Sequence, residues 1–415
     1  MNIAIASTHD SEGGAARYAY RLHRELLHQG INSDMLVRDK FKDDPSVTGI
    51  TSKLEKLKSM ITPKLDALPL LLYPNREKDL FTPGIFGSFN PNVYHNKYDI
   101  FNIHWVAGGF QNIASIGNIS KPVVITLHDS WAFTGGCHVP FECNNFLHKC
   151  GRCPLLQSKK ENDLSARRLL KKKLLWDKKN IVVVGGGSWI AENAKKSTVF
   201  QDYRIETIHP GLNLNIYKPL DKNYCREILG LNVKDKVILF GAVKSTSDKN
   251  KGFRLLILAL KKLISRKLVC CNLKLVVFGA TSSSSDDLNI GIDIQYVGKM
   301  HDDISLSVLY SAADVMIVPS IQESFGQTAS ESFSCGTPVV AFDTSGLKDI
   351  IDHQINGYLA KSFDTDDLAY GIEWILEDSE RLDKMGKKAR EKAISKFDIK
   401  NCANNYIKLF QSIIK

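Results

Sequence analysis

Two carboxylates, Glu323 and Glu331, have the spacing of a pair that binds a long polar ligand. Glu323 stands in a polar loop, and Glu331 stands in a segment of helical periodicity that begins after Gly326. Eight helical positions advance about 12 Å, so the two carboxylates would contact separate parts of the ligand. Gly326 allows close backbone approach, and the N–H groups of a first helical turn suit a phosphate. A nucleotide sugar, with a central phosphate and hydroxyl-rich ends, has this chemistry.

The elements around this pair predict the setting that such a ligand needs. Val315–Val318 is a short apolar run typical of a strand, and Pro319 ends it. A loop and the helical segment follow, Gly336–Pro338 ends the helix, and Val339–Phe342 begins another buried strand. A strand, loop, helix, strand unit of this kind binds its ligand at the carboxyl end of the strand, against the helix N-terminus.

The string ESFGQTASE, followed by GTPVV, resembles the E-x7-E signature of family 4 glycosyltransferases. The resemblance implies a retaining enzyme of the GT-B fold, which has two Rossmann-like doubly wound α/β domains facing a central cleft. It assigns the donor sugar and diphosphate to Glu323 and the residues after it (Ser324, Phe325, Gly326, Gln327), and the ribose hydroxyls to Glu331. The alternative is that the pair are surface carboxylates near a helix start, where the helix dipole favours acidic residues.

In that family, an Arg and a Lys-Gly pair after the first strand of the second domain hold the donor diphosphate. Lys251 and Gly252 match the Lys-Gly pair, but Ala242 occupies the Arg position. Lys244 and Lys249 are therefore candidates to replace the Arg, because Lys binds phosphate as a point charge. Lys251 is expected to act in catalysis by stabilising the departing diphosphate, and no catalytic metal is implied.

Two motifs in the first half of the chain resemble acceptor-side positions of the family. His128 follows the apolar run Val123–Leu127, at a strand end where chemistry is expected, and the resemblance places it beside the transferred sugar. Its alternative role is to cap a turn. Asp129 and Trp131 are weaker candidates for contact with the acceptor. Gly14, in a Gly-Gly loop after the first strand, resembles the family's glycine loop, which faces the donor phosphate or the acceptor, although two glycines in a turn are common.

Four of the nine cysteines lie close together in the sequence, in the string GGCHVPFECNNFLHKCGRC. Soft thiolate ligands favour a structural Zn²⁺ in a closed tetrahedral site. The ligands would be Cys137, Cys143, Cys150 and Cys153, and His138 or His148 are able to replace one of them. Two disulfides, or free thiols, remain as alternatives. A similar cysteine-rich insertion occurs in family members that build bacterial surface polysaccharides.

The chain has a net charge of +10, which suits a phosphorylated substrate, an anionic lipid or nucleic acid. Residues 159–179 concentrate Lys and Arg among leucines and predict either a basic amphipathic helix on an anionic membrane or a solvated helix face. Residues 53–73 also alternate Lys with apolar residues, as a membrane-surface helix or an ordinary packed helix would. Stacking aromatics and recognition motifs do not accompany this charge, so a nucleic-acid partner is not expected.

The order of elements predicts an acceptor-binding Rossmann-like domain at 1–210, a nucleotide-sugar domain at 211–396 and a last helix, 397–415, that crosses back to the first domain. The amino terminus resembles no signal peptide and no apolar run is long enough to span a membrane. A cytoplasmic enzyme, peripheral at the inner face of the membrane, is therefore expected.

The expected activity is transfer of a sugar from a nucleotide-diphosphate sugar to a glycan or lipid-linked acceptor in surface polysaccharide synthesis (lipopolysaccharide, capsule or exopolysaccharide). The alternatives are a nucleotide-sugar epimerase or hydrolase of the same fold, and a non-catalytic partner subunit of another transferase.

Overall fold

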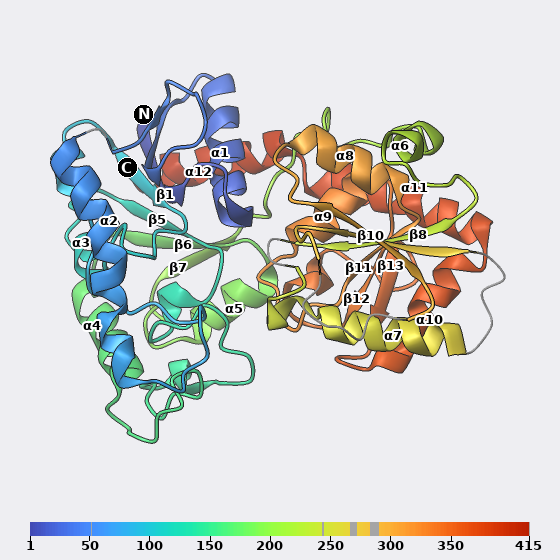
Figure 1. Ribbon diagram of the computed structural model, residues 1–415. Coiled ribbons are helices and arrows are strands. Elements are labelled where there is room, and N and C mark those ends of the chain that lie inside the picture. Colours follow the sequence, from blue (N-terminus) through green and yellow to red (C-terminus); the bar gives the residue numbers. More distant parts are fainter. Residues whose placement is uncertain (51, 243–244, 266–271, 283–289, 415) are drawn as a thin grey trace. The chain divides into compact units, whose positions relative to one another are not determined.

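The computed structural model describes residues 1–50, 52–242, 245–265, 272–282 and 290–414, and the chain forms two compact units (Figure 1). The first unit contains Met1–Gly211 together with Lys400–Lys415, and the second contains Leu212–Ile399. The division falls one residue after the boundary predicted at 210, and the end of the chain groups with the first unit.

The first unit is built on a seven-stranded parallel sheet with the strand order β3-β2-β1-β4-β5-β6-β7. Every residue of β4, β5 and β6 is buried, as expected for parallel strands with helices on both faces. The strands are β1 (Asn2–His9), β2 (Asn32–Asp39), β3 (Val47–Thr48), β4 (Ile100–Ile103), β5 (Val123–Leu127), β6 (Ile181–Gly185) and β7 (Arg204–Thr207).

The helices of this unit are α1 (Gly13–His28), α2 (Lys53–Ala67), α3 (Ile113–Gly117), α4 (Leu164–Trp176) and α5 (Ser188–Lys196), with α12 (Ile399–Ile414) from the end of the chain. Short 3-10 turns are η1 (Leu68–Leu72), η2 (Pro91–Tyr94), η3 (Trp131–Phe133) and η4 (Asn145–Leu147). α12 is tied to the unit through Tyr406, whose hydroxyl hydrogen-bonds Tyr18 at 3.1 Å and Thr126 at 3.0 Å.

The second unit has a six-stranded parallel sheet with the order β10-β9-β8-β11-β12-β13. One apolar cluster packs α6, α8, α9 and α11 against the sheet, and another packs α7 and α10 against it. The strands are β8 (Lys236–Gly241), β9 (Leu273–Phe278), β10 (Asp293–Gly298), β11 (Val315–Val318), β12 (Val339–Phe342) and β13 (Gly357–Ala360). The helices are α6 (Lys222–Ile228), α7 (Phe253–Ser265), α8 (Asp303–Ala312), α9 (Gln327–Ser334), α10 (Thr365–Leu376) and α11 (Ser379–Lys396), with the turns η5 (Lys249–Lys251) and η6 (Ser345–Asp349).

Both sheets reverse their direction of growth at one pair of strands, which is the Rossmann pattern. The reversal lies between β1 and β4 in the first unit and between β8 and β11 in the second. Ligands of such sheets bind beyond the carboxyl ends of these strands, where the connections leave in opposite directions and open a crevice. The loops after β4 and β5, and those after β8 and β11, are therefore where functional side chains are expected.

The strands predicted at 123–127, 315–318 and 339–342 are confirmed to the residue. The side chain of Asp364 caps α10 by accepting from the N–H groups of Asp366 and Asp367. Gly187 occupies the cap position before α5, and Ser188 is the first helical residue.

Candidate functional site

The turn before α7 is joined to the loop after β11 in the second unit. The side-chain amide of Asn250 makes two hydrogen bonds to this loop: it donates to the Gln322 carbonyl at 2.9 Å and accepts from the Gln322 N–H at 3.1 Å. Gly252 has φ 72°, and a Cβ there would lie 1.9 Å from the carbonyl oxygen of Pro319. Only glycine permits this close approach. The contact brings Lys251 to the residues that follow β11.

Lys251 and Glu323 form an ion pair, with 2.7 Å between the lysine Nζ and the carboxylate Oε1. The side chains of Lys251 and Glu323 are only 24% and 15% exposed. Burial lowers the pKa of Lys251, but the neighbouring Glu323 outweighs it and raises the pKa above its ordinary value. Lys251 therefore stays charged at neutral pH. The structure thus brings together two of the residues predicted to take part in catalysis.

The backbone at Glu323 is held on its other side by η6. The Glu323 N–H donates to the Ser345 hydroxyl at 2.8 Å, and the Gly346 N–H donates to the Glu323 carbonyl at 2.9 Å. A Cβ at Gly346 would lie 2.5 Å from the Ser324 carbonyl oxygen, so this crossing is as tight as the one at Gly252. Glu323 is therefore positioned by two other segments of the unit, η5 and η6. Ser345 and Gly346 were not identified from the sequence.

The start of α9 comes next, three residues after Ser324. Gly326 occupies the position before the helix with φ 103°, and Gln327 is the first helical residue, half-buried. Phe325 is buried and packs edge-on against Phe397, with 5.4 Å between the ring centroids. The side chain of Phe325 is thus a core anchor, which leaves its backbone as the part suited to a ligand. The positive end of the α9 dipole favours an anion here.

Glu331 lies inside α9 and is only 4% exposed. Its carboxylate accepts a hydrogen bond of 2.9 Å from the Tyr310 hydroxyl. Burial, followed by the charge of Glu331, raises the pKa of Tyr310 well above its usual range, so the phenol remains a donor. Tyr310 was not predicted as a functional residue, since it lies on another helix, α8, and sequence spacing carries no information on that contact.

The other residues predicted to bind the donor phosphates lie in different parts of the chain. Lys249 is exposed in the turn η5, beside Lys251. Lys244 lies outside the described residues. Gly14, in the other unit, is an exposed residue of the first turn of α1, which follows the carboxyl end of β1.

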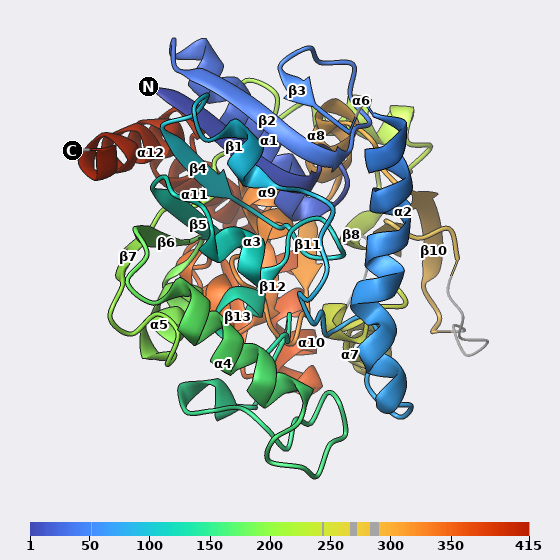
Figure 2. The same ribbon diagram turned by 90° about the vertical axis from the view of Figure 1, so that its left-hand side faces the viewer.

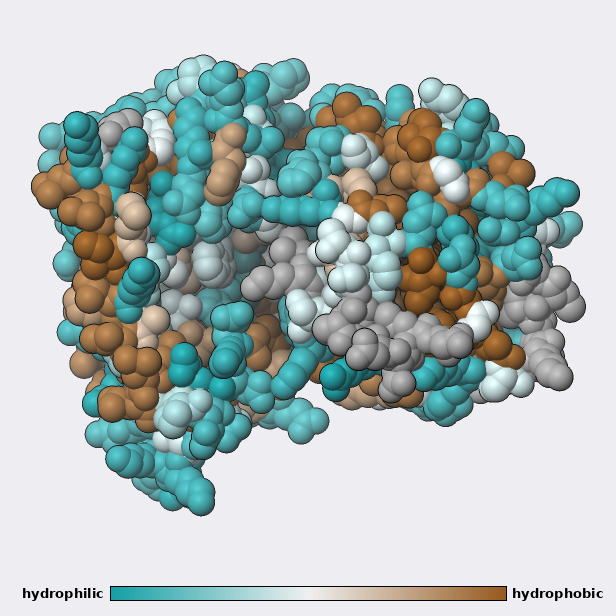
Figure 3. All heavy atoms as spheres, in the orientation of Figure 1, coloured by the Kyte–Doolittle hydropathy of each residue, from teal (hydrophilic) through white to brown (hydrophobic). Residues whose placement is uncertain are grey.

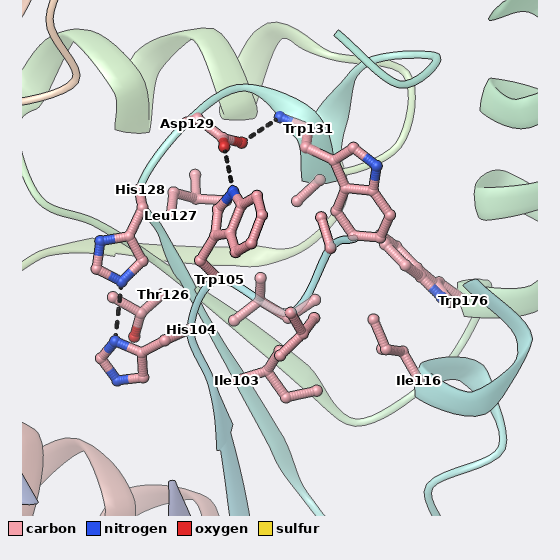
Figure 4. Close-up of a pocket in the computed structure, with 14 residues that line it drawn as sticks. Ile103, His104, Trp105, Ile116, Thr126, Leu127, His128, Asp129, Trp131 and Trp176 are labelled. Carbon is pink, nitrogen blue, oxygen red and sulfur yellow. Dashed lines mark hydrogen bonds between the residues drawn. The ribbon is translucent and has the colours of Figure 1, made fainter. Parts of the chain in front are cut away.

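In the first unit, His128 pairs with a second histidine beyond the carboxyl ends of β4 and β5. The rings of His104 and His128 are joined by a 2.8 Å hydrogen bond between Nδ1 and Nε2 (Figure 4). Burial lowers the pKa of His128 to about 4 and lowers the pKa of His104 well below its ordinary value, so both rings are neutral at pH 7. His128 is therefore a hydrogen-bonding group and not a cation. His104 was missed, although it ends its strand as His128 does.

Asp129 lies beside this pair and is the centre of a hydrogen-bonded network. Its carboxylate accepts from the Trp105 indole at 2.8 Å and from the Trp131 backbone at 2.8 Å, and it pairs with His138 Nδ1 at 2.7 Å. Burial raises the pKa of Asp129, but His138 and these donors together lower it below its ordinary value. The other ring nitrogen of His138 lies 2.7 Å from the Thr82 hydroxyl.

His104, His128 and Asp129 line a cavity of about 20 Å³, with room for about one water molecule. Trp131 is buried in its wall, only 6% exposed, and its indole donates to the Thr82 carbonyl at 2.9 Å. The structure thus gives Trp131 a packing role and places His128 and Asp129 in a polar wall that is fixed by hydrogen bonds.

The four cysteines of the predicted zinc site lie near one another in the first unit. The thiols of Cys137 and Cys153 share a hydrogen bond, and Cys143 and Cys150 interact electrostatically with them. Within the described residues, no group of three or more His, Cys, Asp or Glu has a metal-binding arrangement. His138 points instead to Asp129.

The basic segment 159–179 contains α4, and the charged side chains of this helix do not all face outward. Lys172 is completely buried, donates to the carbonyl oxygens of Trp131 and Thr134, and lies 4.1 Å above the Trp131 ring. Burial lowers the pKa of Lys172 to about 7. Arg168 is half-buried. The prediction of a uniformly solvated or membrane-facing row of cations is therefore wrong for these two residues. Arg167, Lys171 and Lys173 are exposed.

Residues 221–392, nearly all of the second unit, match the family model described as glycosyl transferases group 1. A D-inositol 3-phosphate glycosyltransferase of Thermobispora bispora is 33% identical over 192 residues, 43% of this chain and 44% of that protein. The chain spans about half the length of the curated relatives it matches.

Solved structures resemble the chain over its whole length. Sucrose-phosphate synthase from Thermosynechococcus elongatus has a TM-score of 0.69 and 21% identity, and the match covers 100% of this chain and 99% of that chain. Anabaena HepE in complex with UDP-glucose has a TM-score of 0.67 and 17% identity, with 99% and 100% covered. These likenesses confirm the predicted GT-B fold class of two Rossmann-like domains with parallel sheets.

Proposed function

We propose that this chain is a retaining glycosyltransferase that uses a nucleotide-diphosphate sugar as donor. One observation carries the proposal: the Lys251–Glu323 pair, with 2.7 Å between Nζ and Oε1, stands at the reversal point of the second sheet and just before α9. A cation, a carboxylate and a helix N-terminus at this point suit a sugar attached to a diphosphate. The group 1 family match of the same unit supports this choice.

In the proposed reaction, the bond between the anomeric carbon and the diphosphate oxygen breaks, and the acceptor oxygen bonds to that carbon on the same face. The acceptor proton passes to the leaving phosphate. Lys251 and the first backbone amides of α9 stabilise the negative charge that develops on the diphosphate. Glu323 contacts the sugar and holds Lys251 in place, and Glu331 with Tyr310 binds the ribose. His128, neutral and hydrogen-bonded to His104, is able to donate to or accept from a sugar hydroxyl.

UDP-glucose is the first donor to test, because HepE, a protein of this fold, is known in complex with it. For the acceptor we propose a lipid-linked or glycan substrate of surface polysaccharide synthesis, reached at the cytoplasmic face of the membrane. The net charge of +10 suits a phosphorylated acceptor, and the exposed cations of α4 suit an anionic surface. The described residues contain no helix long and apolar enough to cross a membrane.

We also propose that Cys137, Cys143, Cys150 and Cys153 hold a structural zinc ion, which requires their side chains to shift on binding, because the described residues contain no such group already in a metal-binding arrangement. The support is that their thiols interact with one another and that four thiolates are a favoured ligand set for zinc. Lys172 is a buried cation that interacts with the thiols of Cys150 and Cys137, and it would offset part of the negative charge of a thiolate cluster. The metal would stabilise the fold and take no part in the chemistry.

The test is a transfer assay with radiolabelled UDP-glucose and a bacterial membrane lipid extract, followed by solvent partition. Label that moves to the organic phase, and only with active protein, is the expected result. A panel of other nucleotide sugars covers the choice of donor. Label released as free sugar at the same rate with and without extract would identify a hydrolase, and an altered nucleotide sugar with no transfer would identify an epimerase.

A further inference from the structure

Helix α2 and the turn η1 present apolar side chains to solvent. Leu54, Leu57, Ile61, Leu65 and Leu68 follow one another at steps of three or four residues, which places them on one side of the helix. They are 78%, 55%, 44%, 37% and 57% exposed. Met60, Leu71 and Leu72 extend the same exposed set. In Figure 3, a column of hydrophobic surface runs along the first unit where Figure 1 places α2.

The residues that attach α2 to the unit are polar, which is the reverse of an ordinary packed helix. Thr62 and Asp66 are its buried residues. The Thr62 hydroxyl donates to the Gly109 carbonyl at 2.9 Å, and the Asp66 carboxylate accepts from the N–H groups of Gly84, Ile85 and Phe86. The alternative that this segment is an ordinary amphipathic helix, with its leucines packed on its own domain, is therefore wrong.

The exposed apolar row is accompanied by positive charge. Lys53, Lys56, Lys58 and Lys64 of α2 are all exposed, whereas Asp66 is buried and Glu55 alone gives the helix an exposed acidic group. α4 lies next to this segment, since the Leu164 N–H donates to the Tyr73 hydroxyl and Arg168 interacts with Asp66. It adds the exposed side chains of Arg167, Leu170, Lys171, Lys173 and Leu174.

We propose that α2 and η1 form a membrane-binding element that lies in the plane of an anionic bilayer. Leucine, isoleucine and methionine side chains would enter the acyl boundary, and the lysines of α2 with the cations of α4 would contact anionic headgroups. A helix of 15 residues is about 22 Å long, too short to span the bilayer but sufficient to lie on it. A protein partner fits less well, because the flanking lysines require an acidic surface on both sides of a narrow apolar row.

The element is also connected to the polar wall of the first unit. The loop after β4 supplies both His104 of the histidine pair and Gly109, which accepts from Thr62. A Cβ at Gly109 would lie 2.6 Å from the Pro63 nitrogen, so the loop and the helix are in direct contact. A membrane-bound α2 would therefore hold this wall near the surface where lipid-linked molecules reside (Figure 2 shows α2 at the margin of the unit). The inference itself needs no donor or activity.

The test is sedimentation of the full chain with vesicles of equal parts phosphatidylcholine and phosphatidylglycerol. Leu57→Gln, Ile61→Gln and Leu68→Gln are combined in one variant. The matched control combines Leu258→Gln, Ile304→Gln and Ile394→Gln, whose side chains are 49%, 66% and 50% exposed on the second unit. The α2 variant should bind vesicles at least about tenfold more weakly, and the control should bind like wild type. Thermal unfolding checks that both variants fold.

A second arm separates charge from insertion. Replacing Arg167, Lys171 and Lys173 with Gln should weaken vesicle binding at low salt and reduce its dependence on added salt, while the unchanged lysines of α2 supply the salt dependence that is left. Hydrogen exchange of α2 should slow in the presence of vesicles. The proposal is overturned if wild type does not sediment with these vesicles, or if the α2 variant binds as well as wild type. It is also overturned if wild type is a dimer that the α2 variant converts to a monomer while vesicle binding is unchanged.

Discussion

Replacing Lys251 with Met should nearly abolish sugar transfer without unfolding the protein. The change removes the cation proposed to bind the diphosphate and leaves the Glu323 carboxylate, 15% exposed, without its partner at 2.7 Å. Removing one preorganised electrostatic group typically costs 10²–10³ in kcat, or about 3–4 kcal/mol of transition-state stabilisation. We therefore expect kcat/KM to fall by at least about a hundredfold. Lys274→Met is the matched control, since Lys274 pairs with Asp293 at 2.9 Å near the amino ends of β9 and β10.

Glu323→Gln and the double variant complete a thermodynamic cycle. Glu323→Gln keeps the shape of the side chain but removes the charge that positions Lys251, and its loss should also appear mainly in kcat. A hydrogen bond between charged groups contributes about 1.5–3 kcal/mol, so the two losses should fall short of additivity by about that amount. Steady-state kinetics with UDP-glucose measure the cycle. Turnover of Lys251→Met within about threefold of wild type, or additive losses, would refute the assigned roles.

Three further outcomes are expected. Glu331→Ala and Tyr310→Phe should raise the donor KM more than they lower kcat, because the Tyr310–Glu331 bond of 2.9 Å positions a group that binds the nucleotide in both ground and transition states; an effect on kcat alone would contradict this. Protein purified without chelator should contain about one equivalent of zinc, and chelation should lower the melting temperature before it lowers turnover; elemental analysis that finds no metal would refute the site. In metal-free protein, Lys172 has a pKa of about 7, against 10.5 for an exposed lysine, so the unfolded chain binds more protons between these two pH values. The free energy of unfolding of wild type should therefore rise relative to that of Lys172→Met from pH 7 to pH 10. Urea unfolding that shows no such rise would contradict the burial of the charge.

The strands and the Glu323–Glu331 segment were predictable because short apolar runs and helix stop signals are local properties. The partners of the functional residues were not. Ser345 and Asn250 reach the loop after β11, and Tyr310 reaches Glu331 in α9, each from a different segment, and their sequence spacing does not indicate those contacts. His104 had a usable signal, since it follows its strand directly, as His128 does, and β4 and β5 are adjacent in the sheet.

The two basic helices show why periodicity alone was insufficient. In α4, one helical stripe contains the buried residues Ser165, Leu169, Lys172 and Trp176. The spacing therefore indicated a core position for Lys172, but its charge led to the prediction that it is exposed. In α2, the apolar stripe was visible, but its direction was not. Thr62 and Asp66 turn that stripe to solvent by hydrogen-bonding loops 47 and 18 to 20 residues away in the sequence.

The central claim, that the second unit binds a nucleotide-diphosphate sugar at the loops after β8 and β11, is tested most directly by a crystal structure of the chain with UDP. The account predicts the diphosphate against Lys251 and the backbone of Gly326 and Gln327, with the ribose hydroxyls directed to Glu331. A nucleotide bound elsewhere, with Lys251 and Glu323 untouched by it, would contradict the account.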